Sequence, residues 1–144
     1  MVVVLIIAIL IAIAIPTFLG ARQRANDRAA QSSLRNALTA AKTSFTDTGD
    51  YTGSTPAGLA AIEPSLTFGA TSNGFKAVSV IAAPAGTVWW AEVLSKSGKC
   101  FGIEDNSGVG GAGTTYAGTT TAIAPVAGVC TAPAANPTWT DSSW

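Results

Sequence analysis

The chain begins with a long run of apolar residues. Residues 1–21, MVVVLIIAILIAIAIPTFLGA, contain no charged side chain, and the first fifteen are apolar without exception. A stretch of about 20 apolar residues is long enough for a helix to cross the hydrocarbon core of a bilayer. The pattern therefore predicts a helix that spans a membrane, lies buried among copies of itself, or does both at different times.

The apolar run has two other interpretations, a cleaved secretory signal and a plain membrane anchor. A cleaved secretory signal has a basic region, an apolar core of about 7–15 residues and a small-residue cleavage site. Here no basic residue precedes the longer run, and Gly20 and Ala21 lead directly into Arg22. The sequence therefore disfavours a cleaved signal. A plain membrane anchor that carries an unrelated outer domain is the stronger alternative.

An amphipathic helical pattern follows the apolar run with hardly a break. Only Pro16 and Gly20 interrupt the passage from one to the other. If the helix continues, residues 1–46 extend roughly 70 Å, more than twice the hydrocarbon thickness of about 30 Å. The amphipathic half, residues 22–46, must then pack its apolar face on another part of the chain. Apolar residues spaced three or four apart form this helix stripe: Ala30, Leu34, Leu38, Ala41 and Phe45.

The middle of the chain predicts a small sheet. Residues 47–74 form a predicted connecting loop, with a short helical turn at 56–62. Residues 75–104 form a predicted antiparallel sheet that covers the helix stripe, which gives an α+β fold. Its expected strands are 75–82, 87–95 and 99–104. In the second strand, one face carries Trp89, Ala91 and Val93, and the other carries Val88, Trp90 and Leu94.

The last part of the chain, residues 105–144, is rich in Gly, Thr, Ala, Pro and Ser, a composition that is also typical of disorder. Cys130 lies in it, about thirty residues after Cys100. That spacing excludes a CxxC redox pair and a zinc-ligand cluster. The economical interpretation is a disulfide that closes a loop in an extracytoplasmic, oxidising location. Two buried thiols in a cytosolic protein are the alternative.

The net charge is zero but unevenly distributed. Residues 22–42, the basic collar, carry a net charge of +4, and residues 43–144 carry −4. A basic collar beside an apolar span fits anionic headgroups on the cytoplasmic side of a membrane. It fits an acidic surface on a neighbouring subunit equally well. Within the collar, the spacing of Arg24 and Asp27 allows an ion pair between successive turns.

No set of residues has catalytic spacing. Histidine, the commonest general base and metal ligand, is absent. Acids occur together at Asp47 and Asp50, and at Glu104 and Asp105 beside Asn106. Calcium on these loops is the one metal alternative, but the D-x-[DN]-x-[DN]-G pattern is missing. We therefore expect no catalytic residues, no cofactor and no metal. Because no aromatic residue accompanies the arginines of the collar, direct nucleic-acid binding by one subunit is disfavoured.

The N-terminal run resembles a known family. The segment MVVVLIIAILIAIAIPTFLGARQRA is similar to the N-terminus of type IV pilins and of type II secretion pseudopilins, and the match covers about residues 1–45. The remainder agrees in plan, with Gly49-Asp50-Tyr51 in a connecting loop, an antiparallel meander and a cysteine-closed C-terminal loop. Family members begin with an N-methylated phenylalanine and carry a glutamate four residues later. Since this chain starts at Met1 without that glutamate, we expect it to lack the usual F-T-L-I-E-L start.

The resemblance implies a structural subunit and not an enzyme. It would be the major pilin of a cell-surface filament of identical subunits that supports adhesion, twitching motility or DNA uptake. Before assembly, residues 1–21 would span the inner (cytoplasmic) membrane with the head outside, until the pilus assembly machinery extracts the subunit. The alternatives are a major pseudopilin of a type II secretion-like system and a membrane-anchored extracellular binding domain. The residues implied in the filament core are Val4, Ile7, Ile11, Ile15, Pro16, Phe18 and Gly20.

Overall fold

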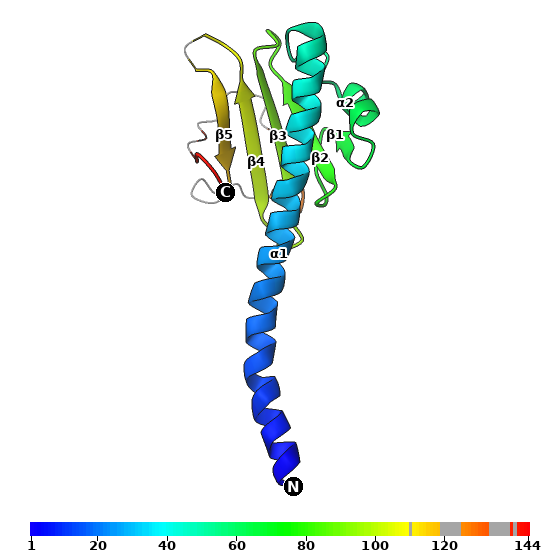
Figure 1. The fold of residues 1–144 in the computed structure, drawn as a ribbon. Coiled ribbons are helices and arrows are strands. Elements are labelled where there is room, and N and C mark those ends of the chain that lie inside the picture. The colour runs from blue at the N-terminus through cyan, green and yellow to red at the C-terminus, as the bar shows by residue number, and fades with distance from the viewer. Residues whose placement is uncertain (110, 119–124, 133–138, 140) are drawn as a thin grey trace.

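The computed structural model describes residues 1–109, 111–118, 125–132, 139 and 141–144. The amphipathic half of one long helix packs on a five-stranded sheet and forms a small head with it. The apolar half of the helix projects from this head (Figure 1). The predicted α+β fold, a long helix against a largely antiparallel sheet, is confirmed.

The long helix, α1 (Val2–Thr48), runs without interruption through both predicted breakers. Its 47 residues give a length of about 70 Å. It ends at Thr48, two residues later than predicted. Gly49 caps it: its φ of 84° is left-handed, and its amide donates to the carbonyl oxygen of Phe45 at 2.7 Å. A left-handed glycine is a common helix end because it carries no Cβ. The apolar and amphipathic segments are therefore two halves of one helix.

The helix stripe of α1 lies against the sheet. Ala30, Leu34 and Ala41 are fully buried, and Leu38 and Phe45 are partly buried against the same core. The buried face is wider than predicted, because small side chains beside the stripe are also covered. These further buried residues are Ser33, Ala37, Ala40 and Ser44. Small side chains on a helix face let its backbone approach the neighbouring element closely.

The head is built on one sheet whose strands follow the chain order from edge to edge. They are β1 (Thr67–Gly69), β2 (Ala77–Ala82), β3 (Val88–Leu94), β4 (Cys100–Asn106) and β5 (Gly113–Ala117). Neighbouring strands are antiparallel except β1 and β2, which are parallel. The three predicted strands correspond to β2, β3 and β4, and they pair as an antiparallel meander.

Two strands and one helix lie outside the predicted sheet region. The strand β1 falls in the predicted connecting loop, and its three residues are too few to show an alternating pattern. The strand β5 falls in the C-terminal region, for which the sequence predicted no strand, and it is paired along its length with β4. The predicted helical turn is α2 (Pro56–Ile62), which begins after Thr55, whose hydroxyl accepts from the amide of Gly58 at 3.1 Å.

Both faces of the sheet are buried. Of the two predicted faces of β3, the one that packs toward α1 carries Trp89, Ala91 and Val93. On the opposite face, parts of the C-terminal region pack on the sheet in a second apolar cluster. This cluster contains Trp90, Ala117, Ala132 and Trp139. The C-terminal region therefore covers the face of the sheet that α1 leaves open.

The predicted disulfide is present and ties this covering segment to the sheet. Cys100, the first residue of β4, is bonded to Cys130, and both are buried. The backbone of Cys130 also pairs with Ser72, through N–H···O bonds of 2.7 and 2.9 Å. Two residues further on, the amide of Ala132 donates to Oγ of Ser79 at 2.8 Å. Covalent and hydrogen bonds thus hold the same short segment.

Candidate functional site

The apolar half of α1, residues 2–21, is exposed along almost its whole length in the described structure. Its Val, Leu, Ile and Phe side chains, from Val2 to Leu19, are 50–69% exposed. A helix that is apolar on every side is stable when lipid or other protein surrounds it. Among the described residues, α1 is the one helix long and apolar enough to cross a membrane, with a mean hydropathy of 3.2 over its most apolar window.

The apolar half places no unsatisfied side-chain polar group on its surface. Thr17 carries its only polar side chain, and the hydroxyl donates to the carbonyl oxygen of Ala14 at 2.9 Å. Hydrogen bonding back to the preceding turn is the usual way to satisfy a hydroxyl within a helix. Transfer of this half from water to an apolar environment therefore leaves no side-chain polar group without a hydrogen bond.

Five of the seven residues predicted for a filament core share one face of this half, because they recur at a spacing of three or four residues. Pro16 and Gly20 do not follow this spacing, and they lie more than about 100° around the helix from that face. Gly20 is half-buried, whereas the backbone of Pro16 is helical and its side chain lies outside what the structure describes. The other five are exposed: Val4, Ile7, Ile11, Ile15 and Phe18.

A polar contact, the base clamp, joins α1 to the turn between β3 and β4. Oγ of Ser95 donates to Oδ1 of Asp27 at 2.7 Å, and the hydroxyl of Ser97 donates to the same oxygen. Nζ of Lys99 lies 3.9 Å from Oδ2. The sequence allowed an ion pair between Asp27 and Arg24. In the described chain, Asp27 instead contacts the turn between β3 and β4, and its ion-pair partner is Lys99.

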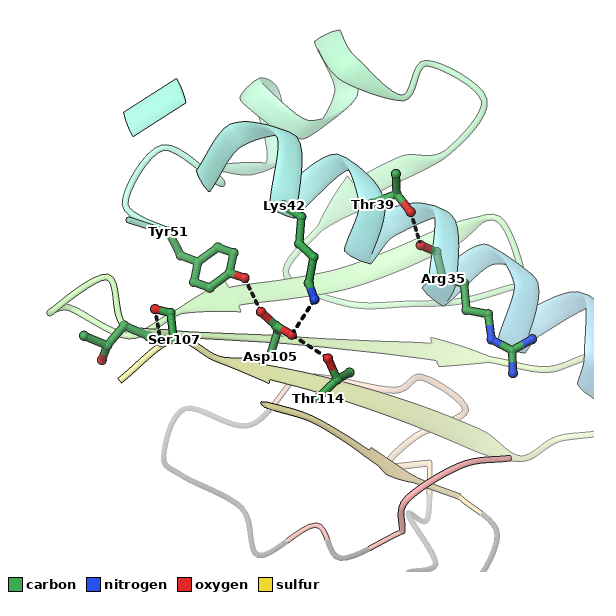
Figure 2. Close-up of polar contacts among 8 residues, drawn as sticks. Arg35, Thr39, Lys42, Tyr51, Asp105, Ser107 and Thr114 are labelled. Atoms are coloured by element: carbon green, nitrogen blue, oxygen red, sulfur yellow. Dashed lines mark hydrogen bonds and ion pairs between the residues drawn. The ribbon is translucent and has the colours of Figure 1, made fainter. Parts of the chain in front are cut away.

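A second contact, the top clamp, joins α1 to β4 near the other end of the head (Figure 2). The buried carboxylate of Asp105 lies 3.0 Å from Nζ of Lys42 and accepts from Oγ1 of Thr114 at 2.6 Å. The hydroxyl of Tyr51 donates to its other oxygen. The pKa of Tyr51 is raised, chiefly because the side chain is buried. The hydrogen bond to Asp105 and the negative charge of Asp105 raise it further. The clamp compensates a charge that would be costly to bury alone.

The paired acids found in the sequence do not form a common site. Glu104 and Asp105 are neighbours along β4 and therefore point to opposite faces of the sheet. Glu104 accepts from Nε1 of Trp90 at 3.0 Å, on the face away from α1. Asp47 is exposed, while Asp50 accepts from the amide of the nearby Thr52. Within the described residues, no three His, Cys, Asp or Glu side chains gather as metal ligands.

Glu92 was not singled out in the sequence, yet it is a buried carboxyl group on the outer face of the sheet. Its side chain is 4% exposed. Burial raises its pKa to about 7 from an ordinary value of 4.5, although the backbone amide of Thr131 opposes this shift by donating to it. The folded protein therefore holds this proton more tightly than the unfolded chain does. The free energy of unfolding must fall as the pH rises from about 4.5 to about 7.

Glu92→Gln is expected to remove most of that fall, which is on the order of 3 kcal/mol, because the amide is neutral at every pH. Burial also raises the pKa of Glu104, so a smaller dependence of the same sign will persist. Denaturant unfolding of the full chain in neutral detergent, followed by tryptophan fluorescence, measures the effect. The exposed control Asp47→Asn should keep the full fall, and an unchanged fall in Glu92→Gln would refute the assignment.

The basic collar lies on the same side of the apolar half as the head. The collar belongs to the same continuous helix as the stripe that carries the head, so both lie on one side of the apolar half. Whichever side of a membrane the head occupies, the collar therefore occupies the same side.

The architecture as a whole combines an exposed apolar helix, a largely antiparallel sheet and a disulfide, which is compatible with a pilin-like subunit. No protein-family model matches the chain, and neither a curated protein nor a solved structure matches it.

Proposed function

We propose that this chain is the structural subunit, or major pilin, of a type IV pilus-like extracellular filament that supports adhesion, twitching motility or DNA uptake. One observation carries the proposal. The exposed apolar half of α1 continues without a break into the half that holds a folded, disulfide-bonded head. Such a surface needs a cover of lipid or of other copies.

Lipid would surround the apolar half before assembly, and other copies of the chain would surround it in the filament. In a bilayer, residues 2–21 extend about 30 Å, which matches the hydrocarbon thickness. In a filament, the apolar halves of identical chains replace the lipid. Lipid tails are as apolar as leucine, so this exchange costs little hydrophobic free energy, and helix packing then decides the outcome.

The shape of the subunit favours an open filament over a closed ring. The head sits at one end of a helix about 70 Å long (Figure 1). Copies that pack their apolar halves side by side can shift along the helix axis, because every side of this half is apolar. Head-to-tail contacts that do not close by rotation generate helical filaments. The two clamps keep each head fixed on its own helix.

Material sheared from the cell surface tests the proposal. We expect negative-stain microscopy to show thin filaments and mass spectrometry of the same fraction to identify this chain. Recovery of the chain solely as a dispersed membrane monomer would contradict the proposal. Filaments confined to the cell envelope would favour the pseudopilin alternative instead.

A further inference from the structure

A groove of about 480 Å³ lies where the apolar half of α1 meets the head. We call it the base groove. Four of its lining residues come from α1, and the fifth comes from the turn between β3 and β4. The lining contains two cations, two amides and one apolar side chain: Arg22, Lys96, Gln23, Asn26 and Leu19.

The base clamp holds the cation of the turn beside the helix. Lys96 lies between Ser95 and Ser97, whose hydroxyls both donate to Asp27 of α1. Its ammonium lies 4.8 Å from the ring centroid of Phe75, a cation–π distance. Lys96 is exposed, but its ammonium lies over the Phe75 ring and both of its neighbours in the chain are bound to Asp27.

The two cations of the base groove have no ion-pair partner among the described residues. Asp27, the carboxylate of the base clamp, is already engaged by Lys99 and the two serines. In the described part of the chain, no carboxylate forms an ion pair with Arg22 or Lys96. Two uncompensated cations beside amide donors are suited to an anion with several oxygen atoms.

The level of the base groove identifies the anion. Arg22 is the first charged side chain after the apolar half, so a bilayer around residues 2–21 puts the groove at the headgroups. Leu19 then lies on the hydrocarbon side of the groove and the cations on the water side. In the proposed orientation, with the disulfide-bonded head outside, these cations lie on the extracytoplasmic side of the span. Basic residues are disfavoured there, and a specific anionic partner would offset that bias.

We propose that the base groove binds the headgroup phosphate of an anionic phospholipid while the chain is in the membrane. The Arg22 guanidinium suits two phosphate oxygens at once, and Lys96 adds a point charge. The amides of Gln23 and Asn26 supply neutral donors, and an acyl chain follows the surface at Leu19. This inference rests on the membrane-inserted stage of the proposed function and does not require the filament.

A second copy of the chain fits the base groove less well. In the described residues, the acids that are not buried and not in the base clamp are Asp47, Asp50 and Glu63, on and after the far end of α1. Asp50 already accepts from Thr52, and Glu63 from Ser65. A lipid phosphate is present at the level of the groove before any copy arrives.

Lipid retention by the full chain tests the proposal. The chain is placed in nanodiscs that contain equal amounts of phosphatidylglycerol and phosphatidylcholine, and the lipids that stay bound after release into the gas phase are counted by native mass spectrometry. Arg22→Gln with Lys96→Gln removes both groove cations. The matched control, Arg24→Gln with Arg28→Gln, removes two exposed charges on the far side of the same helix segment.

We expect the wild type and the control to retain phosphatidylglycerol preferentially, and the groove variant to retain it about tenfold to thirtyfold less. An equal loss in both variants overturns the proposal, because charge alone would then explain binding. Competition by glycerol phosphate at millimolar concentration also overturns it, because the site would then take soluble phosphates. Unchanged lipid retention with impaired filament assembly in the groove variant assigns the groove to a second copy instead.

Flotation with vesicles separates this inference from the proposed function. A chain that does not float with the vesicles overturns both, because the apolar half is then not a membrane span. A chain that floats but shows no preference for phosphatidylglycerol overturns the groove assignment alone.

Discussion

A lysine in place of Ile9 will abolish filament assembly. Ile9 lies in the middle of the apolar half and is 54% exposed in the single chain, so neighbouring copies must cover it in a filament. A charge at the centre of a membrane helix costs about 2.5–3.5 kcal/mol on insertion scales, and an unpaired charge in a dry protein core costs several kcal/mol. The cost recurs in every subunit, so we expect no filaments in sheared material.

The conservative variant Ile9→Leu provides the control for this experiment. It keeps the apolar surface and nearly the same volume, so its filaments should match the wild type in number and length. Vesicle flotation of Ile9→Lys separates a failure to insert from a failure to assemble. Normal filaments from Ile9→Lys would show that the apolar half is not in a dry core and would remove the basis of the proposed function.

Removal of the disulfide has the second largest expected effect. Replacing Cys100 and Cys130 by serine opens a loop with a sequence separation of 30. The chain-entropy relation then gives a loss of about 3–4 kcal/mol in the free energy of unfolding. The hydrogen bonds of the segment to Ser72 and Ser79 remain. We therefore expect a weakened head that still folds, measured by denaturant unfolding of the full chain in neutral detergent.

Reduction of the wild type supplies the matched control. A thiol reductant should lower its unfolding free energy by a similar amount and should leave the double serine variant unaffected. Mass spectrometry of an unreduced digest should find both cysteines in one linked peptide pair. Two free thiols in that digest, or equal stability of the variant and the wild type, would contradict the structure.

The long helix, its buried face and the central strands were predictable because each follows from a periodic pattern of apolar residues. The uncharged run, the stripe from Ala30 to Phe45 and the alternation in β3 are repeated patterns, and each repeat adds to the same signal. The disulfide was predictable by exclusion, since two distant cysteines fit no redox or zinc motif. These features defined the helix, its buried face and three of the strands.

The remaining features depend on partners that are distant in the chain. The strand β5, with the sequence GTTYA, carries little apolar pattern and is ordered by its pairing with β4. The sequence shows Asp27 beside Arg24, whereas the turn that engages it lies about seventy residues later. Glu92 gave no signal, because its burial depends on a C-terminal segment that does not resemble a strand or a helix. The base groove likewise joins Arg22 to a turn far along the sequence.

The spacing of the two clamps has a mechanical consequence. Asp27 and Lys42 are about 22 Å apart along α1, and the buried stripe lies between them. A force along the helix axis loads the clamps and the stripe together in shear, so these contacts resist as a group. Among the described residues, no clamp of this kind joins the apolar half to the head. In addition, Pro16 leaves one carbonyl group of this half without a helical hydrogen bond. Under tension, elastic extension should therefore concentrate in residues 2–21 while the head moves as a rigid body.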